Sequence, residues 1–120
     1  MNVKLEKYFI NAVRLALLDL NKTGVKKNWF HAAIGVRADG AIVTARNGGQ
    51  NTPMPSAHAE ARLCRKLGKD SPLVIVVRVN KQGQWMISKP CQNCEKILRI
   101  MGVKRVLYTV SHEKWAQLKM

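Results

Sequence analysis

The segment LVIVVRV, residues 73–79, constrains the fold of this chain more than any other part of the sequence. It is a continuous apolar run, rich in β-branched residues and interrupted only by Arg78. Such a run is typical of a strand that is covered on both faces, whereas a strand with one wet face alternates apolar and polar residues. The segment therefore predicts a central strand, with other elements packed against both sides of its sheet.

The sequence before this strand predicts one helix, a hairpin and a second helix. Apolar residues at helical spacing indicate an amphipathic helix over residues 4–20. Residues 31–47 have the pattern of two strands joined at Asp39-Gly40, a dipeptide that accepts the backbone angles of a tight hairpin turn. A second helix is expected from a cap at Ser56 to about residue 66, followed by a stop at Gly68.

The sequence after the central strand predicts four further elements. They are a short strand at 85–87, a helix at 90–101 that ends at Gly102, a strand at 103–110 and a short terminal helix within 112–120. Helices that lie between strands imply crossover connections, so the later strands should be parallel and the hairpin antiparallel. We expect an α/β fold, a three-layer α/β/α sandwich with a mixed sheet.

Length and composition indicate one intracellular domain over residues 1–120. A mass of 13.5 kDa and a hydrophobic content of 47% suffice for one core of ordinary size. The apolar runs are too short or too interrupted by charge to span a bilayer, and the N-terminus lacks the apolar centre of a signal peptide. A soluble, cytoplasmic protein is expected. Its three cysteines do not form a secreted disulfide framework, which favours reduced thiols or metal ligation.

The net charge is the most unusual bulk property. The chain carries 21 Lys and Arg against 7 Asp and Glu, a formal charge of +14. Such a field attracts phosphate groups, and nucleic acid is the usual partner of so basic a domain. Basic domains without that role also exist, so the charge favours a polyanion without proving one.

Candidate metal ligands lie at the predicted starts of two helices. His58 opens the second helix, and Cys91 and Cys94 form a C-x-x-C that opens the third. Helix N-termini stabilise thiolates, the form in which cysteine binds metals. One nitrogen and two sulfurs suit Zn²⁺ and leave its fourth tetrahedral position open for water. Glu60, close to His58, is the candidate for moving protons near that water.

Two other interpretations of these residues stay open. The C-x-x-C could be a redox pair, although no βαβ pattern of that kind precedes it. It could also belong to a structural zinc site closed by a fourth protein ligand, for which His31 and His112 are candidates. Cys64 is a poor fourth ligand, because six residues along a helix carry it about 9 Å from His58. We expect Cys64 to be a buried core thiol.

The combination of H-A-E at 58–60 with P-C-x-x-C at 90–94 resembles the zinc-dependent cytidine and deoxycytidylate deaminase superfamily. The resemblance extends over most of the chain through the order of helices and strands. It implies zinc held by His58, Cys91 and Cys94, with Glu60 as the proton shuttle. It further implies that Asn47 contacts a substrate sugar and that the Ala59 amide bonds a base carbonyl.

The implied reaction is hydrolytic deamination of a nucleobase. SKPC at 88–91 lacks the residues that mark the tRNA adenosine deaminases, which favours cytosine over adenine. Basic residues beside Trp29 suit a single strand, and we expect Trp29, Ser88 and Lys89 to contact substrate. The predicted substrate is cytosine in single-stranded DNA or RNA, converted to uracil.

Several alternatives to this substrate and this assembly remain. The first is free dCMP or cytidine, with Arg46 or Lys89 able to hold a 5′-phosphate. Less favoured are adenosine in RNA and an inactive zinc-bearing module that binds nucleic acid. Many relatives are dimers or tetramers, so a homo-oligomer is left open.

Overall fold

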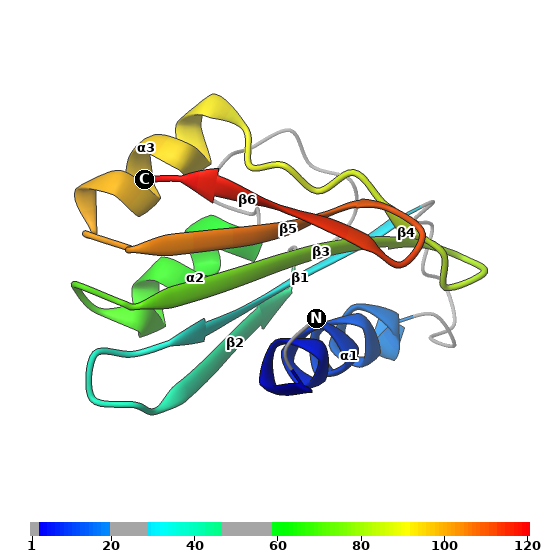
Figure 1. The fold of residues 1–120 in the computed structure, drawn as a ribbon, viewed down its shortest axis with the longest axis horizontal. Helices are drawn as coiled ribbons and strands as arrows, with labels where there is room; N and C mark the ends of the chain where they lie inside the picture. The colour runs from blue at the N-terminus through cyan, green and yellow to red at the C-terminus, as the bar shows by residue number, and fades with distance from the viewer. Residues whose placement is uncertain (1–2, 20–28, 47–58) are drawn as a thin grey trace.

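The computed structural model describes residues 3–19, 29–46 and 59–120, and their elements follow the predicted order almost throughout (Figure 1). The helices are α1 (Val3–Ala16), which continues as the 3-10 turn η1 (Leu17–Asp19), α2 (Ala59–Leu67) and α3 (Gln92–Ile100). The strands are β1 (Trp29–Val36), β2 (Ile42–Arg46), β3 (Leu73–Asn80), β4 (Trp85–Met86), β5 (Arg105–Ser111) and β6 (Lys114–Lys119).

All six strands belong to one mixed sheet. Its order is β2-β1-β3-β5-β6, and the short β4 pairs with β3 outside this path. β3 and β5 are parallel, while β1 pairs antiparallel with both β2 and β3. The expected parallel pairing of the later strands is thus confirmed for β3 and β5, and β3 occupies the centre of the sheet as its apolar sequence predicted.

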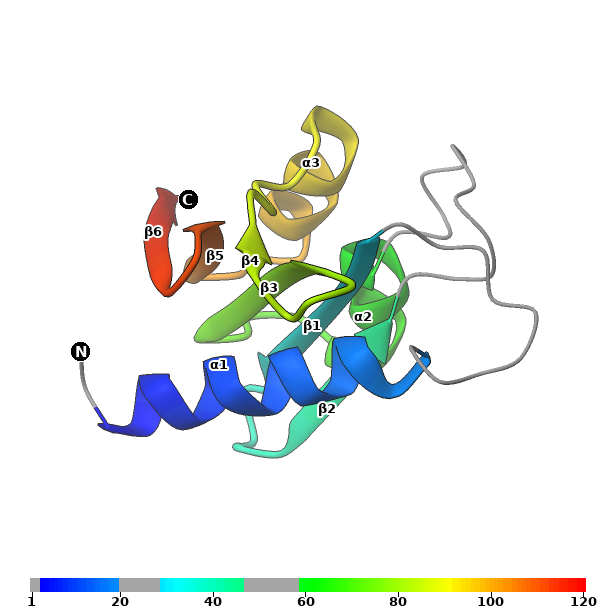
Figure 2. The ribbon, with the colours of Figure 1, turned by 90° about the vertical axis from the view of Figure 1, so that its right-hand side faces the viewer.

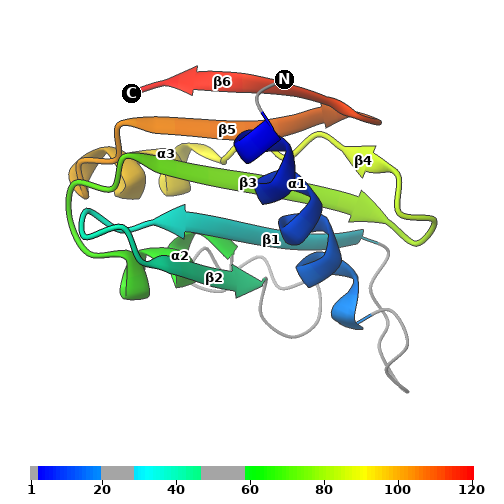
Figure 3. The same ribbon diagram turned by 60° about the horizontal axis from the view of Figure 1, so that its bottom comes forward.

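Alternate residues of β3 enter two separate cores. Val74 and Val76 pack with residues of α2 and α3, whereas Ile75, Val77 and Val79 pack with α1. Figures 2 and 3 show α1 crossing one face of the sheet, with α2 and α3 against the other. Each fully buried Val or Ile contributes roughly 1.5–3 kcal/mol to the stability of the fold. A strand that is covered on both faces is therefore most stabilising when its residues are apolar throughout. The predicted three-layer sandwich is confirmed.

The predicted hairpin turn is confirmed at Asp39-Gly40. The Arg37 N–H donates to the Ala41 carbonyl at 2.8 Å, and the Asp39 carboxylate accepts from the Ala41 N–H at 3.1 Å. Gly40 has φ +92°, a value at which a side chain would be strained. The turn therefore fixes the register in which β1 pairs with β2.

The predicted terminal helix within 112–120 is wrong, because these residues form β6. β6 pairs antiparallel with β5 along most of its length. Trp115 packs against the α1 core, and Leu118 and Met120 pack against the α2/α3 core. Alternate burial of this kind has the two-residue period of a strand, and the helical interpretation missed it. None of the helices within the described ranges has the length and hydrophobicity that a bilayer crossing requires.

Candidate active site

The first turns of α2 and α3 supply the chemically active side chains of the described structure. Both helices lie on the same face of the sheet and run against the direction of β3 (Figure 1). Glu60, in the first turn of α2, has 6% of its surface exposed. It is the only acidic or basic side chain among the buried residues of the described ranges. A carboxyl group is buried in this way only where a specific partner compensates for the lost water.

The cysteine pair begins α3. Cys91 is the N-cap residue, with extended backbone angles of φ −65° and ψ 164° and no capping bond from its side chain. It is exposed, whereas Cys94, one turn later, is completely buried. Serine, threonine, asparagine or aspartate would cap this helix better than cysteine. The residue at this position is therefore not explained by helix stability.

Cys94 lies against both Glu60 and Cys91, where α3 packs on α2. Burial, the charge of Glu60, and hydrogen bonds with Cys91 and Glu60 raise the pKa of the Cys94 thiol well above its usual value. A divalent cation bound here would favour the thiolate form of Cys94 and so offset that effect. The donor set therefore fits a metal that prefers sulfur, such as zinc.

Two of the predicted site residues, His58 and Asn47, lie outside the described residues. So does the side chain of Trp29, whose backbone begins β1. Within the part of the chain that the structure describes, no three His, Cys, Asp or Glu side chains are arranged as a metal site. The three-ligand set of His58, Cys91 and Cys94 thus remains a prediction, to which the structure contributes the two cysteines and their neighbour Glu60.

Cys64 is confirmed as a core thiol. It is 8% exposed and belongs to the core between the sheet and the helices α2 and α3. Burial and, secondly, the charge of Glu60 raise its pKa to about 11. His112 is engaged elsewhere, because its Nδ1 accepts the Trp85 N–H at 3.3 Å. His31 is half-buried on β1, opposite Arg78 of β3.

The remaining residues that were predicted to contact substrate differ in their exposure to solvent. Ala59 is fully buried at the start of α2, and Lys89 is exposed. The Ser88 side chain is buried, and its hydroxyl bonds to the sheet at Val76 and Thr109. Its partner Thr109 was not predicted from the sequence. The one available signal was a threonine within the otherwise apolar run VLYTV.

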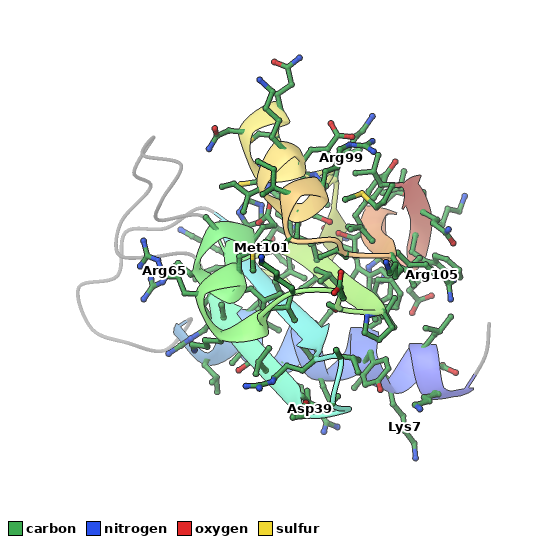
Figure 4. The ribbon with its side chains drawn as sticks, turned by 90° about the vertical axis from the view of Figure 1, so that its left-hand side faces the viewer. Lys7, Asp39, Arg65, Arg99, Met101 and Arg105 are labelled. Atoms are coloured by element: carbon green, nitrogen blue, oxygen red, sulfur yellow. The ribbon has the colours of Figure 1, made fainter. Side chains whose placement is uncertain are left out.

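The outer face of α2 is basic. Arg62, Arg65 and Lys66 are exposed there, and Lys69, two residues after the helix ends, is exposed as well. Figure 4 shows Arg65 projecting outward from α2, away from the sheet, and the Lys66 ammonium donates to the Thr44 carbonyl at 2.8 Å. The three cations of the helix face no exposed carboxylate within it, because Glu60, the one acid of α2, is buried. The surface charge is thus spatially separate from Glu60.

Sequence comparison identifies the family. A sequence profile of the cytidine and deoxycytidylate deaminase zinc-binding region matches residues 6–110. The match covers most of the chain and includes both helix starts described above, and the chain belongs to this family. A comparison with curated protein sequences finds no significant match.

Solved structures of cytidine deaminases share the fold. The enzyme from Mycobacterium leprae aligns with a TM-score of 0.63 at 20% identity, covering 97% of this chain and 94% of that chain. The enzyme from Burkholderia pseudomallei aligns with a TM-score of 0.61 at 15% identity, covering 92% and 91%. That from Mycobacterium tuberculosis aligns with a TM-score of 0.57 at 18% identity, again covering 92% and 91%. This is the cytidine deaminase-like fold that the sequence motifs led us to expect.

Proposed function

We propose that this protein is a zinc-dependent hydrolase that deaminates the cytosine of a free nucleoside or nucleotide to uracil. The observation that carries the proposal is the buried contact of Glu60 with Cys94, the second cysteine of the C-x-x-C, where α2 packs on α3. Family membership supports the reaction class. The similar structures support the small substrate, because those enzymes are named as cytidine deaminases.

Three residues would hold the metal in this proposal. They are His58, Cys91 and Cys94, one ligand from the start of α2 and two from the start of α3. A zinc ion bound there would lower the pKa of water toward neutrality and so make a nucleophile available near pH 7. Cys64 takes no part, because its thiol is packed in the core.

Glu60 would transfer the protons of the reaction. Its carboxylate accepts a proton from the attacking water and passes it to N3 of the pyrimidine ring. A further transfer to the exocyclic amine lets the C4–N4 bond break, so cytosine and water yield uracil and ammonia. General acid–base catalysis by one positioned group typically contributes about 10²–10⁴-fold to the rate. Burial suits this role, since it keeps competing water away from the carboxylate.

The start of α2 also offers a way to hold the base. The first N–H groups of a helix have no partner inside the helix, so the Ala59 amide can donate to the carbonyl oxygen of cytosine. Asn47 would contact the sugar. Lys89, exposed three residues after β4, would reach a 5′-phosphate if the substrate is a nucleotide.

Cytosine in single-stranded nucleic acid is the second candidate substrate. It is favoured by the net charge of +14 and by the four exposed cations on α2 and just after it. Those cations could attract a phosphate backbone without touching the reacting base.

The test supplies zinc-loaded protein with cytidine, dCMP, single-stranded DNA and RNA in parallel, and measures uracil product by mass. We expect turnover of cytidine or dCMP, and its loss in Glu60→Gln, which keeps the shape of the side chain. Cys64→Ala is the matched control on the same helix and should stay active. Turnover of polymers alone would replace the proposed substrate with nucleic acid. Zinc binding without turnover of any substrate would refute the proposed deaminase activity.

A further inference from the structure

The central sheet forks near the carboxyl end of β3. Parallel pairing of β3 with β5 ends at Val76 and Tyr108, and pairing of β3 with β4 begins at Arg78. Ser88, two residues after β4, bonds to both β3 and β5 at this fork. Its backbone N–H donates to the Thr109 carbonyl at 2.9 Å. The fork is therefore the place at which the chain leaves the sheet on its way to Cys91.

Two buried hydroxyls replace strand pairing at the fork. The Ser88 hydroxyl donates to the Val76 carbonyl at 2.9 Å and accepts the Thr109 N–H at 2.8 Å. The Thr109 hydroxyl lies 2.7 Å from the Ser88 hydroxyl and 2.6 Å from the Met86 carbonyl, and it accepts the Arg78 N–H at 3.2 Å. These bonds satisfy backbone groups that no neighbouring strand can reach, and leaving such groups without partners is costly.

Only three residues separate this anchor from the helix that carries the cysteines. They are Lys89, Pro90 and Cys91. Pro90 is buried, its ring fixes its own φ, and it restricts Lys89 to extended conformations. Cys91 is itself extended. The short, restricted segment thus ties the start of α3 to the sheet through Ser88.

We propose that Ser88 and Thr109 are positioning residues, which hold Cys91 and Cys94 in the place relative to the sheet and α2 that zinc binding requires. This inference rests on the zinc site proposed above. Loss of either hydroxyl would let residues 88–91 shift relative to the sheet. Because metal ligands must be placed within a few tenths of an ångström, such a shift weakens metal binding before it unfolds the domain.

The chain offers a matched control for Ser88. Ser71 is also buried, and its hydroxyl also bonds carbonyl groups of the sheet, those of Val36 and Leu73. It lies before β3, at the opposite end of that strand from the fork. Ser88→Ala and Ser71→Ala thus remove the same atom from similar surroundings, and only the first removes it near the cysteines.

The experiment measures zinc affinity of metal-free protein by competition with a chromogenic chelator, beside the melting temperature. Both variants should melt several degrees lower than the wild type. Ser88→Ala should bind zinc about 10–100-fold more weakly, the usual effect of losing a group that orients metal ligands. Ser71→Ala should bind zinc within about twofold of the wild type, because its hydroxyl lies outside the fork.

A second pair of variants decides the matter if Ser88→Ala does not fold. Thr109→Ser keeps the hydroxyl and should retain zinc affinity, while Thr109→Val keeps the shape and should lose it by a similar factor. Equal zinc affinity in Ser88→Ala and Ser71→Ala, or in the two Thr109 variants, would overturn the inference and leave the zinc site intact. Failure of the wild type to bind zinc would instead refute the proposed site, and this inference with it.

Discussion

The two faces of the central sheet bury different kinds of side chain. On the α1 face, Phe9 stacks on Trp85 with ring centroids 5.4 Å apart and contacts Trp115 at 5.8 Å. On the α2/α3 face, the core includes Cys64, and the helices above it bury Glu60 and Cys94. Aromatic contacts add stability without exposing reactive groups, whereas a buried carboxylate beside thiols is destabilising by itself. The comparison indicates that one face stabilises the domain and that the other carries the residues of the proposed active site.

The largest expected effect is on the α2/α3 face. Glu60→Gln should lower kcat by about 10²–10⁴-fold, because the amide cannot accept the proton. Stability should be unchanged or slightly higher, because the variant buries no charge. Steady-state kinetics and a thermal melt of the same preparation check both statements. A variant that loses activity and several degrees of melting temperature together would show that Glu60 has a structural role.

The opposite pattern is expected on the α1 face. Phe9→Ala removes a completely buried ring and should lower the free energy of unfolding by about 3–5 kcal/mol. The folded fraction should still bind one zinc ion with wild-type affinity. Urea denaturation and metal analysis of the folded protein measure the two quantities. Loss of zinc from protein that is still folded would mean that the two faces are coupled, and the comparison would fail.

Cys64 tests how far the proposed zinc site extends within the α2/α3 face. Cys64→Ala should lower stability by about 1 kcal/mol and leave zinc stoichiometry and turnover unchanged. In the wild type, with a pKa of about 11, its thiol should react far more slowly with an alkylating reagent at pH 8 than an unperturbed thiol would. Peptide mapping after timed alkylation gives the rate. Loss of zinc from Cys64→Ala would identify the Cys64 thiol as a zinc ligand and contradict its assignment to the core.

The smallest effect is expected at the surface of α2. Arg65→Glu and Lys69→Glu should each change stability by no more than about 0.5 kcal/mol, because both side chains are exposed. The KM for cytidine should also stay constant, since Arg65 lies on the outer face of α2 and Lys69 follows the end of the helix. A lower rate on single-stranded nucleic acid in low salt, without any change for cytidine, would support the polymer substrate.

The fold was largely predictable because its main signals are local. The run at 73–79 predicted the central strand, and Asp39-Gly40 predicted the hairpin turn that the structure confirms. The error at 112–120 has a physical cause. A short edge strand takes its conformation from the strand beside it, and a six-residue segment contains too few residues to separate a period of 2 from one of 3.6.

The candidate site was predictable in composition and less so in arrangement. The sequence by itself determined the central buried strand, the basic surface, and the motifs around Glu60 and the cysteine pair. Only the tertiary structure decided that Glu60 and Cys94 meet in a buried position, and that Ser88 and Thr109 anchor the start of α3. The reason is physical. Helical and strand periods are properties of neighbouring residues, whereas the Ser88–Thr109 contact joins residues 21 positions apart and exists only where β3, β4 and β5 come together.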